Sequence, residues 1–276
     1  VYKRQIEESM QSSSQTDHAP YFAGADVGAS RTKVVIIDAH SHIAGYCVAK
    51  SGTDFTATAD RCLSEALAMA DIGKDRIVRT ISTGYGRKNV SYAQDHRTEI
   101  SCHGKGCYHY FPFAITIIDI GGQDNKIIKI DENGRRTAFK MNRKCAAGTG
   151  AFLEEMSPRL DIPLSEMNGL AEASTDMVKL GSFCTVFSAT EVLENIRRGK
   201  RVEDIVKGLF FSVISRITEM DAFTEKVVMT GGVVAHNPYL VEMTQELIKR
   251  PILVPELPQF TGALGAALYA KETYEG

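Results

Sequence analysis

The 276-residue sequence lacks any long apolar run, and it lacks an excess of charge of either sign. No stretch approaches the roughly 18 apolar residues that a membrane-spanning helix needs. Its 32 Lys and Arg residues nearly balance 34 Asp and Glu residues, for a formal net charge of -2, and the basic residues are dispersed. A nucleic acid or an anionic membrane would call for clustered positive charge. We therefore expect neither as a partner.

Cysteine is also scarce, with six residues at positions 47, 62, 102, 107, 145 and 184. That number is too small for a disulfide scaffold in a chain of this length. No charged segment followed by an apolar one opens the sequence, so we expect a cytoplasmic protein whose cysteines are thiols. Residues 1–20 are polar, and we expect them to be a disordered tail or an expression remnant.

Two common nucleotide-binding motifs are absent as well. No Gly-x-x-x-x-Gly-Lys-Ser/Thr P-loop occurs. Gly148 and Gly150 begin a dinucleotide fingerprint, but Leu153 stands where its third glycine belongs. The two commonest nucleotide-binding folds are therefore excluded.

What the sequence does contain is one order of elements written twice. In the first copy, strand patterns at 21–26, 33–38 and 43–49 precede a helical pattern at 54–70 and a strand at 77–82. In the second, strands at 115–120, 126–131 and 137–141 precede helices at 148–159, 163–173, 186–198 and 202–223 and a strand at 226–230. A helix at 238–249, a short strand at 252–254 and a helix at 261–274 finish the chain.

This repetition predicts an α/β protein with two similar lobes that face each other across a nucleotide-sized cleft. We place the boundary near Pro112. The N-terminal lobe would span residues 21–112, and the C-terminal lobe, enlarged by helices, would span residues 113–276.

In each copy the first strand ends in an acid and a glycine turn. These segments are Asp26-Val27-Gly28-Ala29-Ser30 and Asp119-Ile120-Gly121-Gly122-Gln123. Glycine lets the backbone approach a phosphate, turn N–H groups can cradle its oxygens, and an aspartate can hold Mg²⁺ through water. Two ordinary hairpin turns with incidental acids are the alternative. A later segment, Thr230-Gly231-Gly232, would suit a surface for adenine or ribose.

Cys145 lies three residues before Gly148-Thr149-Gly150, and Cys184 comes later, in Ser182-Phe183-Cys184-Thr185. Two thiolates are half of the four that hold an iron–sulfur cluster, so a symmetric dimer could complete such a site. The alternative for any lone cysteine is a small buried apolar residue. Cys102 and Cys107, with His103 and His109 nearby, could mimic a metal site, but this Cys-x₄-Cys pair lacks a second pair at zinc spacing.

Six segments carry a resemblance to known ATP-binding proteins. They are Asp26-x-Gly-x-x-x-x-Lys33, Ser82-Thr83-Gly84-Tyr85-Gly86-Arg87, Ile118-Asp119-Ile120-Gly121-Gly122-Gln123-Asp124, Lys144-Cys145-Ala146-Ala147-Gly148-Thr149-Gly150, Cys184-Thr185-Val186-Phe187 and Gly262-Ala263-Leu264-Gly265-Ala266-Ala267. The two turns and the Thr230 segment resemble the phosphate and adenosine loops of actin-like ATPases and sugar kinases. From Phe22 onward, the chain closely resembles the BadF/BadG/BcrA/BcrD-type ATPases, which are the 2-hydroxyacyl-CoA dehydratase activators and the ATP-binding subunits of benzoyl-CoA reductase.

The resemblance implies a duplicated actin-like ATPase (ribonuclease H-like) fold and an ATP-driven activator of anaerobic metabolism. It implies a homodimer whose Cys145 and Cys184, two from each protomer, hold one 4Fe–4S cluster. Each cysteine would precede a helix, whose N-terminus favours negative charge. A ferredoxin or flavodoxin would supply the electron, and a CoA-thioester dehydratase or reductase would accept it.

The resemblance also assigns roles in the ATP/ADP site. Asp26 and Asp119 would serve Mg²⁺ through water, and either could be the base, while Gln123 would position the attacking water. The candidate nucleotide contacts are Gly28, Ala29, Ser30, Thr32, Lys33, Gly121, Gly122, Gln123, Gly231, Gly232 and Gln259.

Two other functions remain open at this point. A small-molecule kinase of the same fold would use an acid to deprotonate a substrate hydroxyl, but it would leave both cysteines unexplained. A nucleotide-dependent assembly protein would need no redox chemistry. The long N-terminal tail and the segment Val234-Ala235-His236-Asn237-Pro238 depart from the family pattern, and they leave the adenosine contacts and the choice of acceptor undecided.

Overall fold

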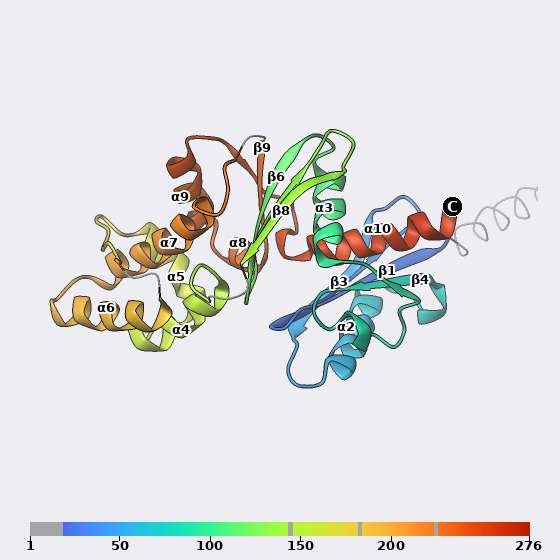
Figure 1. Ribbon diagram of the computed structural model, residues 1–276. Helices are drawn as coiled ribbons and strands as arrows, with labels where there is room; N and C mark the ends of the chain where they lie inside the picture. The colour runs from blue at the N-terminus through green and yellow to red at the C-terminus, as the bar shows by residue number, and fades with distance from the viewer. Residues whose placement is uncertain (1–18, 143–145, 182–183, 224–225) are drawn as a thin grey trace, which may run out of the picture. The chain divides into compact units, whose positions relative to one another are not determined.

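The computed structural model describes residues 19–142, 146–181, 184–223 and 226–276. Contacts divide the chain into two compact units, shown in Figure 1. Unit 1 comprises Val1–Gly106 with Gly262–Gly276, and unit 2 comprises Cys107–Thr261. This division rests on contacts alone, so the functional lobes of the sequence analysis, with their boundary near Pro112, stay a prediction.

Unit 1 is built on a five-stranded mixed sheet in the order β3-β2-β1-β4-β5. Its elements are β1 (Tyr21–Val27), β2 (Arg31–Ile37), β3 (Ile43–Lys50), α2 (Phe55–Ala70), β4 (Ile77–Thr83), β5 (Asp95–His96), most of α3 (Glu99–Tyr110) and most of α10 (Thr261–Glu275). The first three strands pair antiparallel, and β4 and β5 extend the sheet in parallel. The short turns between β1, β2 and β3 allow the antiparallel pairs, while α2 is the crossover that the parallel pair requires.

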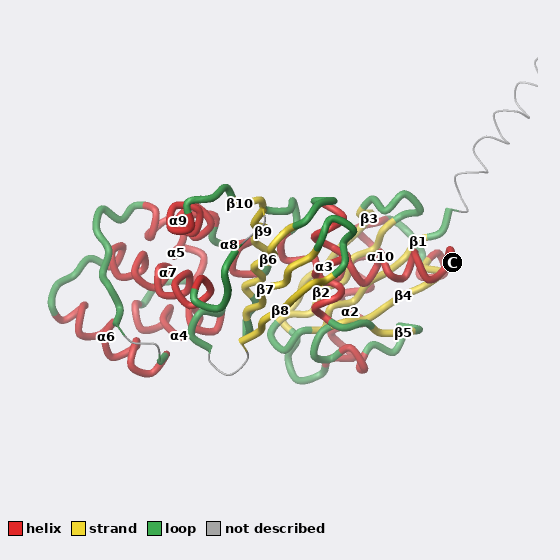
Figure 2. Tube along the Cα trace, turned by 45° about the horizontal axis from the view of Figure 1, so that its top comes forward, coloured by secondary structure: helices red, strands yellow, loops and turns green. Residues whose placement is uncertain are grey.

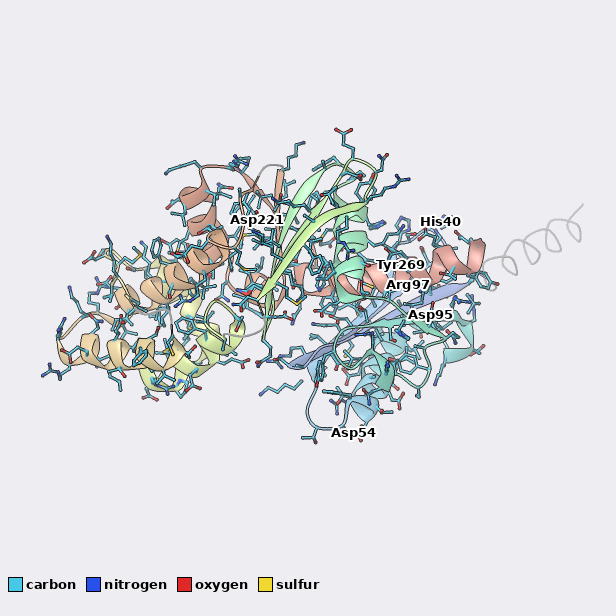
Figure 3. All side chains as sticks on the ribbon, in the orientation of Figure 1. His40, Asp54, Asp95, Arg97, Asp221 and Tyr269 are labelled. Atoms are coloured by element: carbon cyan, nitrogen blue, oxygen red, sulfur yellow. The ribbon has the colours of Figure 1, made fainter. Side chains whose placement is uncertain are left out.

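Helices cover this sheet because β1 is apolar almost throughout and must be buried on both faces. Helix α2 begins after Asp54, labelled in Figure 3, whose side chain accepts a hydrogen bond from the Ala57 N–H at 2.9 Å. Helix α10 approaches β1 so closely that a Cβ at Gly24 would collide with the backbone of Ala263 and Ala267. The glycine is therefore required by packing.

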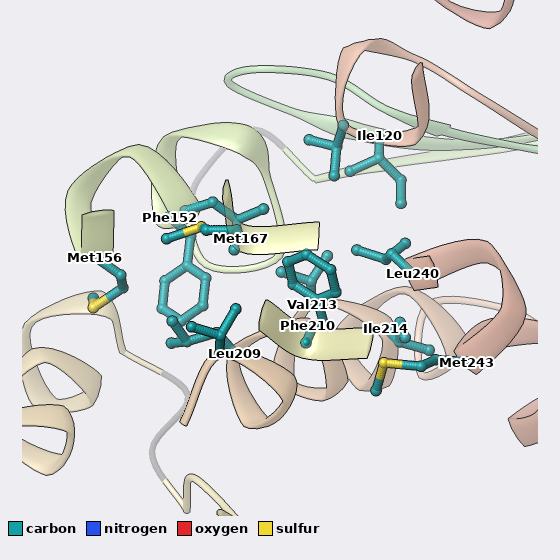
Figure 4. Close-up of a cluster of buried hydrophobic side chains, with 14 of the residues drawn as sticks. Ile120, Phe152, Met156, Met167, Leu209, Phe210, Val213, Ile214, Leu240 and Met243 are labelled. Carbon is teal, nitrogen blue, oxygen red and sulfur yellow. The ribbon is translucent and has the colours of Figure 1, made fainter. Parts of the chain in front are cut away.

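Unit 2 repeats the plan with a sheet in the order β10-β9-β6-β7-β8, whose strands can be followed in Figure 2. Its strands are β6 (Ile115–Ile120), β7 (Asn125–Ile130), β8 (Arg136–Asn142), β9 (Lys226–Thr230) and β10 (Ile252–Leu253). Its helices are α4 (Gly150–Leu160), α5 (Met167–Glu172), α6 (Thr185–Arg197), α7 (Val202–Thr218), α8 (Gly232–His236) and α9 (Pro238–Ile248). The core among these helices includes Phe152, Phe210 and Ile120, the last residue of β6 (Figure 4).

The two sheets match strand for strand, because β6 to β10 take the places of β1 to β5. The register matches too. Asp26 pairs with Lys33 on β2 and with Thr83 on β4, and Asp119 pairs with Lys126 on β7 and with Thr230 on β9. The predicted duplicated actin-like ATPase fold is thus confirmed.

Most predicted elements are confirmed within two residues, with several exceptions. The helix expected at 163–173 is an α-helix only over Met167–Glu172, and the short elements β5 and α8 were not predicted. Helix α3 was not predicted, and the segment around Cys102 and His103 lies within it. The helix expected at 202–223 ends at Thr218. Within the described part of the chain, no helix is long and apolar enough to cross a membrane.

Candidate functional site

Asp26 lies at the end of β1 and is 2 % exposed. Its Oδ2 accepts a hydrogen bond from Lys33 Nζ at 3.0 Å. Its Oδ1 is buried and has no hydrogen-bond partner among the described residues. Burying an unpaired polar oxygen costs about 1–3 kcal/mol, and more for a charged group. A buried carboxylate oxygen without a protein partner calls for an explanation, and a ligand or a metal-bound water is a candidate partner for it.

The turn after Asp26 is closed by the Gly28 N–H, which donates to the Arg31 carbonyl at 3.0 Å. Ala29 is exposed and Ser30 is half-buried, so both lie where a phosphate could approach. Thr32 is different, because it is fully buried and its hydroxyl lies 2.9 Å from the Ser51 hydroxyl. Thr32 therefore supports the turn through its buried hydrogen bond with Ser51. Its predicted contact with phosphate stays a prediction.

Two glycines from distant parts of the sequence border the Asp26 carboxylate. Gly84 has a φ of +87°, and a Cβ there would lie 2.6 Å from Asp26 Oδ1. A Cβ at Gly262 would lie 3.2 Å from both Asp26 Oδ2 and His103 Nε2. Because glycine has no Cβ, the backbone at both positions can lie next to the Asp26 carboxylate. In the sequence, Gly84 and Gly262 stand out only as parts of motifs, and no sequence pattern places His103 beside Gly262 at the Asp26 carboxylate.

The second turn has the same construction. Asp119 ends β6, and its Oδ2 accepts a hydrogen bond from Lys126 Nζ at 3.0 Å. The Gly121 N–H donates to the Asp124 carbonyl at 2.9 Å, as Gly28 does to Arg31. The spacing Asp-x-Gly-x-x-x-x-Lys occurs in both copies and would have revealed Lys126 in the sequence. Gln123 is exposed on this turn.

The two acids nevertheless differ in their surroundings. Asp119 Oδ1 accepts a hydrogen bond from the Thr230 hydroxyl at 3.0 Å, so both of its oxygens have partners. Lys126 is 1 % exposed and also donates to Asp124 Oδ1 at 2.6 Å. Both oxygens of Asp119 thus have hydrogen-bond partners, whereas the buried Oδ1 of Asp26 has none among the described residues.

The predicted adenosine segment brings its residues together. Gly231 has a φ of +102°, which favours glycine, and its N–H donates to the Pro258 carbonyl at 2.9 Å. Helix α8 begins at Gly232, and a Cβ at Gly232 would lie 3.3 Å from Gln259 Nε2. Gly231, Gly232 and Gln259 are therefore neighbours, while their contact with adenosine stays a prediction.

Hydrogen bonds join the second turn to helix α4. The N–H groups of Gly150 and Ala151 donate to the carbonyls of Gly121 and Gly122 at 2.9 and 2.8 Å. The side-chain amide of Asn125 donates to the Gly148 carbonyl at 2.7 Å. No local pattern in the sequence points to Asn125, because its partner is a backbone carbonyl 23 residues away.

Of the two predicted cluster ligands, Cys184 is exposed and is the N-cap of α6, while Cys145 lies outside the described residues. An accessible thiol at a helix start fits a thiolate ligand of a negatively charged cluster. Cys102 and Cys107 are buried in α3. Desolvation raises the pKa of Cys102 to about 12. Among the described residues, no group of three or more His, Cys, Asp or Glu side chains could hold a metal ion.

The chain is similar to a known family of ATPases and to its curated members. Residues 23–270 match the BadF/BadG/BcrA/BcrD ATPase family. The chain is 44 % identical to the activator of lactoyl-CoA dehydratase from Anaerotignum propionicum, over 91 % of this chain and 98 % of that one.

Two solved structures are similar throughout. The activator of the 2-hydroxyisocaproyl-CoA dehydratase from Clostridium difficile, with bound ADPNP, is 39 % identical over 92 % of this chain and 96 % of that one, with a TM-score of 0.87. Component A of the Acidaminococcus fermentans (R)-2-hydroxyglutaryl-CoA dehydratase is 38 % identical over 93 % of this chain and 100 % of that one, with a TM-score of 0.88. With the duplicated acid turns, these matches show that the chain belongs to the BadF/BadG/BcrA/BcrD ATPase family.

Proposed function

We propose that the protein is an ATP-dependent activator that delivers one low-potential electron to a CoA-thioester dehydratase or reductase. The donor would be a reduced ferredoxin or flavodoxin. The relatives at about 40 % identity are named as activators of 2-hydroxyacyl-CoA dehydratases, which favours that acceptor class over a benzoyl-CoA reductase. The observation that carries the proposal is the pair of matching acid turns, with Cys184 exposed at the start of a helix in the same chain.

The nucleotide would bind with its phosphates at the two turns. The similarity to a structure with bound ADPNP supports ATP as the ligand. The backbone N–H groups around Ala29 and Ser30, and those around Gly122 and Gln123, would face the phosphate oxygens, and Lys33 would neutralise charge. Bound Mg²⁺ would neutralise part of the negative charge of the phosphates.

The surroundings of the two acids suggest a division of roles. Asp26 would hold a metal-bound water through its open Oδ1. Asp119, which already bonds to Lys126 and Thr230, would keep the second turn in place and act on ligands through its remaining lone pairs. Gln123, exposed on that turn, would orient the attacking water.

Cys145 and Cys184 of two copies would hold the cluster, which supplies one-electron transfer when bound. The surface next to Cys184 supports a dimer, because Val186 and Phe187 are 71 % and 65 % exposed. Exposed large apolar side chains beside a functional residue are typical of a surface that another molecule covers. The occupant we propose is the same surface of a second copy.

Anaerobic purification tests the proposal. The expected product is a brown dimer with about four irons, the content of one 4Fe–4S cluster. Cys145→Ala and Cys184→Ala should each lose the iron, whereas Cys47→Ala, a buried cysteine away from both segments, should keep it. A colourless monomer that phosphorylates a small molecule would instead support the kinase alternative.

The acceptor is tested separately. The reduced dimer is mixed with MgATP and a purified dehydratase, and dehydration of a 2-hydroxyacyl-CoA is measured. Omission of ATP or replacement of Cys184 should abolish activation. Activation that persists without ATP would contradict the proposed coupling.

A further inference from the structure

Asn125 is fully buried at the start of β7, directly after the second acid turn. Its Nδ2 donates to the Gly148 carbonyl at 2.7 Å. A carbonyl only accepts, so the amide nitrogen must face Gly148. The Oδ1 atom then points elsewhere, and it is buried without a hydrogen-bond partner among the described residues. The side chain is therefore oriented by its bond to Gly148 and not by a general polar environment.

Two backbone bonds lie beside the Asn125 bond. Helix α4 begins at Gly150, and the first N–H groups of a helix have no partner within it. Here Gly150 N–H donates to Gly121 and Ala151 N–H donates to Gly122. The approach is close, since a Cβ at Gly150 would lie 3.2 Å from Gly122 Cα. Three bonds thus fasten residues 148–151 to the turn.

The first copy has a shorter version of this arrangement. Asn125 and Thr32 are equivalent, since each pairs with the residue that follows the acid. Thr32 bonds to Ser51, and the Ser51 hydroxyl donates to the Gly28 carbonyl at 2.6 Å. In both copies, the chain that follows the third strand returns to the turn and donates to its first glycine carbonyl. In the second copy the returning segment continues directly from Cys145.

We infer that Asn125 is a positioning residue that makes the segment Ala146–Ala151 move together with the second acid turn. This inference rests on the proposed function, which places nucleotide phosphates at that turn. A nucleotide that draws the N–H groups of the turn toward its oxygens changes the orientation of the Gly121 and Gly122 carbonyls. Those carbonyls hold the start of α4, and Asn125 keeps Gly148 in line with them. By thermodynamic linkage, the segment and the nucleotide must then influence each other equally.

Hydrogen–deuterium exchange at the Gly150 and Ala151 amides tests the inference on the cluster-free dimer or monomer. In the wild type, ADP or ADPNP with Mg²⁺ should slow this exchange about tenfold, within the usual range of coupling between sites. In Asn125→Thr, which carries the residue of the first copy, the side chain is too short to reach Gly148. The slowing should then fall below about twofold, which would leave little coupling.

The ratio of exchange with and without nucleotide separates positioning from general loosening. A variant that is only less stable would exchange faster in both states and keep the ratio. Asn133→Thr, in the turn at the other end of β7, is the matched control and should keep the wild-type ratio. Alkylation of Cys145 gives a second readout, in which nucleotide should alter the wild-type rate and leave the Asn125→Thr rate unchanged. Asn125→Ser, which is not β-branched, serves if the threonine variant does not fold.

Nucleotide binding is measured in parallel with a fluorescent ADP. If the wild type binds nucleotide but its Gly150 and Ala151 amides show no slowing, or if Asn125→Thr and Asn125→Ser keep the slowing, the inference is overturned and the proposed function stands. If the wild type binds no nucleotide, the proposed function fails and the inference falls with it.

Discussion

Thr230 donates its hydroxyl hydrogen to Oδ1 of Asp119 across 3.0 Å, and this bond has no counterpart in the first copy. There the equivalent Thr83 donates to the Arg97 carbonyl instead, and Asp26 Oδ1 is left open. The two acids occupy the same register in their sheets, but their hydrogen-bond partners differ. Equivalent position therefore does not imply equivalent chemistry.

The first prediction concerns the metal. Asp26→Asn should remove most of the gain in ADP affinity that Mg²⁺ provides, because the amide gives the open position a neutral oxygen or a donor in place of a carboxylate. Asp119→Asn should keep more of that gain. Calorimetric titration with ADP, with and without Mg²⁺, measures it. A larger loss in Asp119→Asn than in Asp26→Asn would refute the division of roles.

A second prediction concerns the buried lysine. Lys126→Met leaves Asp119 and Asp124 without their shared cation in a position that is 1 % exposed. Breaking a buried ion pair by removing one partner typically costs about 3–5 kcal/mol. Lys33→Met is the matched control, because Lys33 occupies the same register, is more exposed and pairs with Asp26 at 3.0 Å. Thermal unfolding should show the larger decrease for Lys126→Met, and equal decreases would count against it.

The third prediction concerns Gly84. Alanine there must adopt a φ of +87° and also place its Cβ against Asp26 Oδ1 and the Val27 carbonyl. Gly52→Ala has a similar strain, with a φ of +63°, but nothing lies within 4 Å of its Cβ. The positive φ alone costs about 1–2 kcal/mol. We expect Gly52→Ala to lower stability only, and Gly84→Ala to weaken Mg-nucleotide binding as well. If the two variants bind the nucleotide equally well, Gly84 does not shape the acid's surroundings.

The sequence predicted the strands well because their apolar runs are bounded by turn residues, and β6 and β9 agree to the residue. Helix α3 was missed because it contains Gly104 and Gly106, and because Ile100 is the one large aliphatic residue on its buried side, beside Cys102, His103 and Cys107. Tertiary packing compensates for that poor propensity, since a Cβ at Gly265 would collide with the Cys102 backbone. Thr98, which accepts a hydrogen bond from the Ser101 N–H, is the start signal that was available.

The candidate site was predictable only where a motif repeats. The acids, glycines and Lys33 follow from the spacing, and the same spacing identifies Lys126. The roles of Thr230 and Asn125 depend on partners 111 and 23 residues away, so no local pattern carries them. Asp26 Oδ1 has no hydrogen-bond partner among the described residues, while the equivalent Thr83 donates to the Arg97 carbonyl, and a sequence does not record that choice.

The fourth prediction is a pH dependence of cysteine alkylation. Burial raises the pKa of Cys102 to about 12, so very little of this thiol is ionised at pH 8. The thiolate is the nucleophile, so the rate should be very low at neutral pH and rise with pH until about 12. Desolvation also raises the pKa of Cys107, Cys47 and Cys62. In cluster-free protein, Cys184 should react first with iodoacetamide, and mass spectrometry should find Cys102 unmodified unless the chain unfolds. Early labelling of Cys102 would show that α3 is not buried as described.

The last prediction addresses the surface beside Cys184. The Phe187 side chain is 65 % exposed in the single chain, and we propose that a second copy covers it. Phe187→Glu would place a charge in that interface. Loss of a large apolar anchor at an interface typically costs about 2 kcal/mol or more, which weakens association at least tenfold. Sedimentation should therefore show a weaker dimer, and iron content should fall because one copy supplies only half the ligands. Phe139→Glu on β8, where the side chain is 50 % exposed, should change neither. If Phe187→Glu is still a dimer with full iron content, the interface lies on another surface. If Phe139→Glu weakens the dimer and lowers the iron content equally, the effect comes from added charge on any exposed apolar residue.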